Sequence, residues 1–191
     1  INITRVSSCA GTDTTEGGGG GGGGGTAKVY EVTDTSNTKH ISDDSSESNR
    51  TRIVEKINSS SSALVGKITK QLNIPIVKFG SPGATPVINA KIWNSAGAVI
   101  YTSPTTFAPN ALGTTFDATA IKVFDFTTNT RVFAVGDRIG LEYTGTSAGN
   151  DIMIGYSTSE GTGSSGSYVQ HYEGTTWENQ TSRRLACTIF E

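Results

Sequence analysis

Residues 123–156, VFDFTTNTRVFAVGDRIGLEYTGTSAGNDIMIGY, decide the fold of this chain. They contain three segments in which apolar residues alternate with polar or small ones, at 123–126, 138–143 and 152–156. Clusters of Asn, Gly, Asp and Ser separate these segments. Alternation with a period of two, bounded by turn-forming residues, is typical of half-buried antiparallel strands. We therefore predict three strands of an all-β sandwich, with four apolar residues buried between its sheets: Ile139, Leu141, Ile152 and Ile154.

Shorter alternating segments continue this pattern on both sides. They predict strands at 27–32, 64–72, 74–79, 87–93, 99–101, 168–172 and 185–190. Residues 80–83 and 94–97 are turn sequences, and Pro75 predicts a sheet edge or a bulge. Residues 102–120 are expected to form a long loop, and Trp177 falls in an expected turn. Residues 52–57 fit either a strand or one helical turn, and no convincing longer helix is present.

The N-terminal third differs in composition from the rest of the chain, because it contains a run of glycines and a long polar stretch. We predict an extension over residues 1–62 and a sandwich domain over residues 63–191. The extension comprises an alternating segment at 1–9, a tether at 10–26 with nine consecutive glycines, a strand at 27–32 and a polar excursion at 33–62. Glycines offer no side chain to bury, and ordering each backbone unit costs roughly 1–2 kcal/mol. The tether is therefore expected to be flexible.

Composition and charge exclude some partners and favour a location. The net charge of −2 provides no electrostatic attraction for nucleic acid or an anionic membrane, and no run of eighteen apolar residues is present. The chain starts at Ile1 without an initiator methionine, which is typical of a processed, secreted form. Four Asn-X-Ser/Thr sequons begin at Asn2, Asn49, Asn58 and Asn179. We expect an extracellular protein, at the cell surface or secreted, that carries glycans if these sequons are used.

The two cysteines, Cys9 and Cys187, lie near opposite ends of the chain. Two cysteines match no zinc-binding pattern, and in a secreted protein a disulfide is the leading interpretation. Two unpaired buried thiols are the alternative. A disulfide within one chain and a disulfide between two chains both remain open at this stage.

Several short motifs together resemble a known family. They are VGKI at 65–68, GSP at 80–82, KIWNSAG at 91–97, AVGDRIG at 134–140 and YTG at 143–145, with Phe126 and the last strand. In this order they resemble the jelly-roll β-sandwich domain repeated in large extracellular proteins of archaea and some bacteria. The resemblance covers residues 63–191 and implies a jelly-roll fold. It also implies a structural role in a surface layer, adhesin or filament, whereas related domains bind carbohydrate.

The polar side chains do not form a catalytic motif. His40, His171, Asp137 and Glu142 share no spacing that joins an acid, a base and a nucleophile, so we expect no enzyme. We expect no cofactor other than a possible structural calcium ion, because related sugar-binding jelly rolls often hold one. The weak candidate ligands are Asp43, Asp44 and Glu47, with Asp117 and Asp151 at predicted loop edges. Trp177 is the best candidate for stacking against a sugar ring.

The glycine tether leads to a hypothesis of self-assembly. Extended at about 3.1–3.5 Å per residue, residues 10–25 reach about 50 Å, which exceeds a domain diameter of roughly 35–40 Å. Residues 1–9, with Ile1, Ile3 and Val6, can therefore add as a strand to a neighbouring copy. We expect a head-to-tail filament or surface layer of identical subunits. The alternative is a carbohydrate-binding or adhesion module with a flexible linker.

Overall fold

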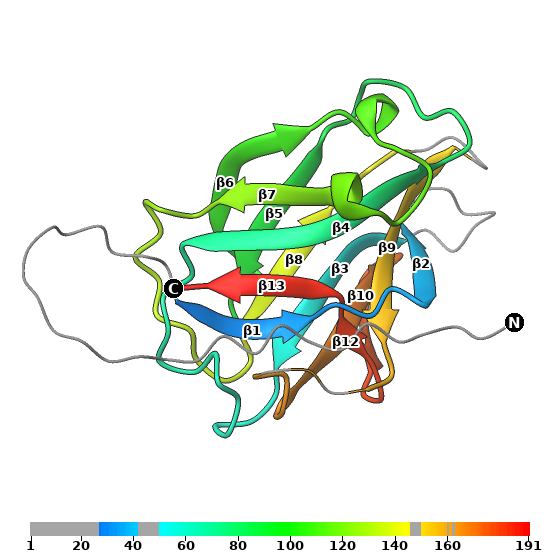
Figure 1. Cartoon of the computed structure of the whole chain (residues 1–191). Coiled ribbons are helices and arrows are strands. Elements are labelled where there is room, and N and C mark those ends of the chain that lie inside the picture. The colour runs from blue at the N-terminus through cyan, green and yellow to red at the C-terminus, as the bar shows by residue number, and fades with distance from the viewer. Residues whose placement is uncertain (1–26, 42–49, 146–149, 160, 162) are drawn as a thin grey trace, which may run out of the picture.

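The computed structural model describes residues 27–41, 50–145, 150–159, 161 and 163–191. In these residues thirteen strands and two short 3₁₀ helices form two antiparallel sheets that pack face to face (Figure 1). This arrangement confirms the all-β sandwich. A jelly-roll order of the strands stays a prediction, as does any structure for residues 1–26, which lie outside the described part.

One sheet has six strands in the order β11-β10-β3-β8-β5-β6. Their bounds are β3 (Arg50–Ile57), β5 (Ile88–Trp93), β6 (Val99–Phe107), β8 (Arg138–Glu142), β10 (Ser167–Glu173) and β11 (Thr176–Gln180). The predicted strand at 138–143 thus lies in the middle of a sheet, paired with β3 on one side and β5 on the other.

The second sheet has seven strands. Five follow the order β1-β13-β4-β9-β12, while β2 pairs with β9 and β7 pairs with β4. Their bounds are β1 (Lys28–Val32), β2 (Asn37–Ile41), β4 (Gln71–Phe79), β7 (Ile121–Asp125), β9 (Asp151–Ser157), β12 (Arg184–Leu185) and β13 (Cys187–Phe190). Figure 1 shows β7, β4, β13 and β1 side by side across the front of the molecule. The 3₁₀ helices η1 (Pro109–Ala111) and η2 (Ala118–Ala120) lie between β6 and β7.

The core forms where alternate residues of both sheets meet. Ile139, Leu141, Ile152 and Ile154 are all buried in it, as the alternation predicts. The same pattern buries Ile88, Ala90 and Ile92 of β5 and Leu72, Ile74 and Ile76 of β4. Hence one side chain in two points inward, and the residues between them, such as Lys91 and Pro75, stand on the outer faces.

Glu55 places a carboxyl group between the two sheets. Glu55 of β3 is fully buried and accepts a hydrogen bond of 2.6 Å from the Ser167 hydroxyl and one of 2.8 Å from the Leu185 backbone N–H. Because Leu185 belongs to β12, the second contact joins the two sheets. Burial raises the pKa of Glu55 to about 7, although both hydrogen bonds oppose the rise.

The expected boundary at residue 63 is wrong for the described residues. The strand predicted at 27–32 is present as β1, but it pairs with β13 inside the sandwich. The stretch expected as a polar excursion supplies β2, paired with β9, and β3, paired with β8 and β10. The sequence pattern does not indicate these strands, because β2 buries only Ile41 and the charged residues of β3 either bond to the other sheet or face outward.

Other expected boundaries also differ. The segment expected as a long loop after Tyr101 continues as a strand to Phe107, and Trp177 lies in β11 rather than in a turn. Residues 64–70 are irregular, and β4 runs without a break through Pro75. Ile74 and Pro75 pair only with β7 among the described strands, since the pairing with β13 covers Gln71–Asn73 and the pairing with β9 begins at Ile76. The missing N–H of Pro75 therefore falls at an interruption of the ladder.

Candidate functional sites

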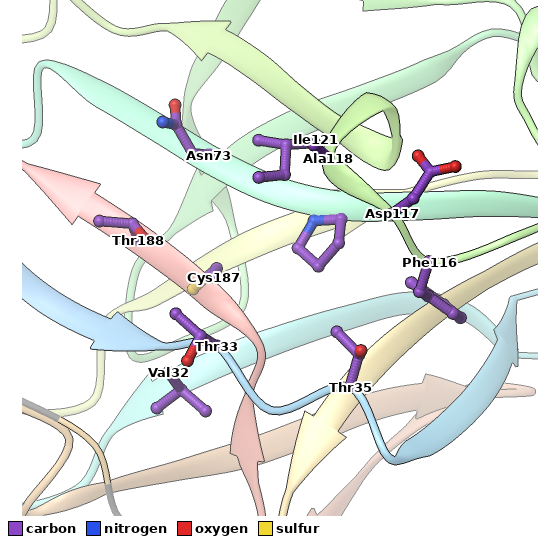
Figure 2. Close-up of a pocket in the computed structure, with 11 residues that line it drawn as sticks. Val32, Thr33, Thr35, Asn73, Phe116, Asp117, Ala118, Ile121, Cys187 and Thr188 are labelled. Carbon is purple, nitrogen blue, oxygen red and sulfur yellow. The ribbon is translucent and has the colours of Figure 1, made fainter. Parts of the chain in front are cut away.

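A groove of about 320 Å³ lies on the outer face of the seven-stranded sheet (Figure 2). Asn73 and Pro75 alternate with the buried Leu72 and Ile74, so the groove is on the side of β4 that faces away from the core. The remaining lining residues come from the β1–β2 connection, from the segment around η2 and from β13: Val32, Thr33, Thr35, Phe116, Asp117, Ala118, Ile121, Cys187 and Thr188. We call this feature the Cys187 groove.

The groove lies beside the interruption at Pro75. There β13 no longer pairs with β4, and β9 has not yet begun to pair. The floor and walls are largely apolar, and Ile121 and Val123 of β7 are 48% and 46% exposed on the adjoining surface. Large exposed aliphatic side chains next to an apolar groove mark a surface suited to binding another apolar segment.

Cys187 contributes to the lining of this groove, but its side chain belongs to the buried core. The residue is 2% exposed and alternates with Thr188, which pairs with the outward Asn73. Cys187 itself pairs in register with Val32 of β1. Burial raises the pKa of the Cys187 thiol, and the charge of Glu55 raises it further. The side chain is therefore a thiol at neutral pH. Its expected partner, Cys9, lies outside the described residues.

Asp117 is the one carboxylate among the groove residues. It accepts hydrogen bonds from the hydroxyl and the backbone N–H of Thr119, at 2.6 and 2.8 Å, and so caps η2. The hydroxyl bond is the main cause that lowers the pKa of Asp117. This carboxylate stabilises the 3₁₀ turn at the rim of the groove, because its oxygens bind the turn's own donors.

A second feature covers the outer face of the six-stranded sheet. Trp177 and Tyr172 pair across β11 and β10, and Arg52 and Glu142 continue the same row on β3 and β8. The Arg52 guanidinium carbon lies 4.4 Å from the centre of the Tyr172 ring, and its Nε donates to Glu142 over 2.8 Å. Cations over aromatic faces are stabilised by the ring quadrupole.

A second row carries further members of this cluster. Lys56, Arg138 and Trp93 are neighbours on β3, β8 and β5. The Arg138 guanidinium lies 4.8 Å from the Trp177 ring, and Trp177 meets Trp93 edge to face at 6.0 Å. We call the outward side chains of these two rows, with Lys91, the cationic face.

The cationic face is concave. Trp177 stands on β11 at one edge of the sheet, with β10, β3 and β8 between it and β5. Even so, a Cβ atom on Gly97, in the turn after β5, would lie only 3.1 Å from Trp177 Nε1. The outer residue Val54 and the Trp93 ring beneath are fully buried as a result. The β10–β11 hairpin at the edge of the sheet therefore curves over the cationic face. Trp177 itself is half-buried.

Positive charge dominates this face. Its outward positions on β3, β8 and β5 carry four cationic side chains and one carboxylate: Arg52, Lys56, Lys91, Arg138 and Glu142. Burial alone would raise the pKa of Glu142, but hydrogen bonds from Lys91 and Arg52 outweigh it and lower the pKa. Glu142 is therefore ionised, and the face keeps a surplus of three positive charges. Lys91 and Trp93 both lie in the strand predicted at 87–93, but the segment that contains Arg52 was not assigned from sequence.

The remaining candidate residues are dispersed. Asn58 is exposed just after β3, and Asn179 is exposed on β11, where its side-chain oxygen accepts from the amide of Gln170. The other sequons, Asn2 and Asn49, the assembly residues Ile1, Ile3 and Val6, and the weak calcium candidates Asp43, Asp44 and Glu47 all lie outside the described residues.

The four polar residues considered for catalysis occupy separate contacts. His40 bonds the buried Asp151 at 2.9 Å, Asp137 binds Arg131 at 2.9 Å, and Glu142 belongs to the cationic face. His171 lies on the inner face of β10, where burial and the Arg50 charge lower its pKa to about 4. Across the described ranges no three His, Cys, Asp or Glu side chains are placed to hold a metal ion.

In the described part of the chain, no helix has the length and apolar character needed to cross a membrane. No family model, no curated protein and no solved structure matches this chain.

Proposed function

We propose that this chain is a subunit of an extracellular polymer, in which residues 1–9 of one copy dock in the Cys187 groove of the next. The observation that carries this proposal is the apolar groove beside Pro75 on the outer face, whose lining includes Cys187 of β13. Cys9 is the only other cysteine in the sequence and ends the alternating segment at 1–9. Docking of this segment would place Cys9 close to β13, the strand that carries Cys187.

The chemistry of the two partners is complementary. In an extended conformation Ile1 and Ile3 would share one face, which could bury against Pro75, Phe116 and the exposed aliphatic residues of β7. Addition of an extended segment to a sheet combines main-chain hydrogen bonds with side-chain pockets. The interruption beside Pro75 leaves part of β4 with a partner strand on β7 alone in the described structure. Contacts of this head-to-tail kind propagate into fibres when they do not close.

The test is to fill the groove and observe assembly. Ala118 is exposed and lines the groove, so Ala118→Trp would block it without disturbing the core. Ala111→Trp is the matched control, because Ala111 is an exposed alanine in the other 3₁₀ helix and does not line the groove. We expect the full-length chain and Ala111→Trp to form filaments by negative-stain electron microscopy, and Ala118→Trp to remain monomeric in sedimentation. Filaments of Ala118→Trp equal to wild type would reject the groove as the acceptor.

Carbohydrate binding is the second candidate function. It is favoured by one observation, the half-buried Trp177 ring set among cations and amides on a concave sheet face. This role needs no assembly, since the cationic face and the Cys187 groove belong to different sheets.

A further inference from the structure

We propose that the cationic face binds an acidic polysaccharide, specifically a chain of uronic acid residues. The inference rests on the second candidate function and names its ligand class. It does not depend on assembly.

The positive charge of the cationic face favours a ligand that carries carboxylate groups. Arg52 and Lys91 share Glu142, so two cations are opposed by one carboxylate at that point. Arg138 donates to neutral acceptors, the Gln170 amide oxygen and the backbone oxygens of Asn94 and Ser95. Lys56 donates to the Tyr168 hydroxyl, which is also neutral. The surplus positive charge is therefore concentrated on one side of a molecule whose net charge is −2, and charge complementarity favours an anionic partner there.

The concave shape and the aromatic side chains of the cationic face favour a ligand with a sugar ring. Trp177 and Tyr172 are half-buried, so part of each ring remains available beside the cations. The apolar C–H face of a pyranose can stack on such a ring, while the exposed amide of Asn179 can meet its hydroxyls. Side chains of Arg52 and Lys91 retain 25% and 17% exposure, so their charged groups can reach a bound carboxylate. A uronic acid is the sugar that carries both a stacking face and a carboxylate.

The tryptophan content makes a direct measurement possible. Trp93 and Trp177 are the only two tryptophans in the sequence, and both belong to this face. Titration of the full chain with oligogalacturonate should therefore change the intrinsic fluorescence in a saturable way. Added salt should weaken this binding, because ions screen exposed charges.

Two ligand controls separate charge from sugar. Methyl-esterified oligogalacturonate keeps the ring and loses the charge, whereas polyglutamate keeps the charge and lacks the ring. We expect each to bind at least about fivefold more weakly than oligogalacturonate. Equal binding of the ester would overturn the acidic class but leave a carbohydrate-binding role. Equal binding of polyglutamate would show that the face does not require a sugar ring, and would overturn the proposal.

Variants locate the site. The double change Lys56→Gln and Lys91→Gln should weaken oligogalacturonate binding at least about fivefold, since both positions are on the cationic face. Lys122→Gln, on β7 of the other sheet, is the matched control and should bind like wild type. Unchanged affinity of the double variant would place the site elsewhere and overturn the proposal. If none of the three ligands binds, the inference fails, while the assembly proposal is unaffected.

Discussion

Glu55 couples the stability of this protein to pH. Its folded-state pKa is raised from 4.5 to about 7, chiefly by burial. Below pH 4.5 the carboxyl is protonated in both the folded and the unfolded chain. Between pH 4.5 and 7 the unfolded chain releases this proton first, so the free energy of unfolding falls as pH rises and stays lower above pH 7.

We therefore expect the free energy of unfolding to drop by about 3 kcal/mol across that window because of this one group. Urea denaturation at a series of pH values measures the slope. Glu55→Gln should flatten it, whatever constant cost the amide adds beside the Leu185 N–H. If the slope of Glu55→Gln matched wild type between pH 4.5 and 7, another group would be responsible.

Leu141 is a second residue whose contribution can be measured. It is fully buried at the centre of the six-stranded sheet, with β3 and β5 on its two sides. Leu141→Ala should reduce the free energy of unfolding by about 2–5 kcal/mol, because it removes apolar contacts and leaves a cavity. Chemical denaturation checks this value, with Thr102→Ala, an exposed position on β6, as the control. A loss below 1 kcal/mol would contradict the position of Leu141 in the core.

At the scale of elements, the β10–β11 hairpin depends on side chains as well as on its ladder. β11 pairs only with β10 among the described strands, so it is an edge. Trp177 extends from it over Tyr172 and Arg138 to the turn at Gly97. This contact explains why an edge strand with mostly polar residues stays attached to the curved sheet.

Trp177→Ala should accordingly release the hairpin before the rest of the fold. We expect a loss of about 2 kcal/mol in unfolding free energy, less than for a fully buried Trp because Trp177 is half-buried. Amide hydrogen exchange should become faster in β11 and unchanged in β8. Thr176→Ala, on the opposite face of β11, is the control. Equal protection of β11 in both variants would show that the ladder alone holds the hairpin.

At the scale of the whole molecule, a disulfide between Cys9 and Cys187 would either close the chain or join neighbouring subunits. Formation of a disulfide converts two thiols to one S–S bond and passes two electrons and two protons to an oxidant such as oxidised glutathione. Between subunits this bond would lock the docked segment in place. Within one chain it would close almost the entire sequence into a loop, which models value at about 4–5 kcal/mol.

Non-reducing denaturing electrophoresis of the oxidised full-length chain distinguishes the two. We expect a ladder of multimers that collapses on addition of thiol. Cys9→Ser should run as a monomer and serves as the control for multimers held by other means. A single wild-type monomer band with no titratable thiol would mean that the bond forms within the chain.

Features that depend on neighbouring residues could be predicted from the sequence, whereas features that depend on contacts between distant segments could not. Alternation is a local property, because successive side chains of a strand point to opposite faces wherever that strand pairs. The class of fold, the burial of Ile139, Leu141, Ile152 and Ile154 and the hairpin turn at Gly97 therefore followed from the sequence. β2 did not, because its polar residues are held by backbone bonds to β9 and only Ile41 is buried.

The candidate sites were decided by tertiary structure. Arg52, Glu142 and Tyr172 are distant in sequence and become neighbours only through the register of β3 with β8 and β10. Cys187 alternates like a core residue and is buried in the core, and the interruption of pairing beside Pro75 makes this part of β13 the wall of a groove. The sequence alone determines which residues of a strand share a face. The strand pairing determines what that face meets, because register is set by contacts between segments far apart in the chain.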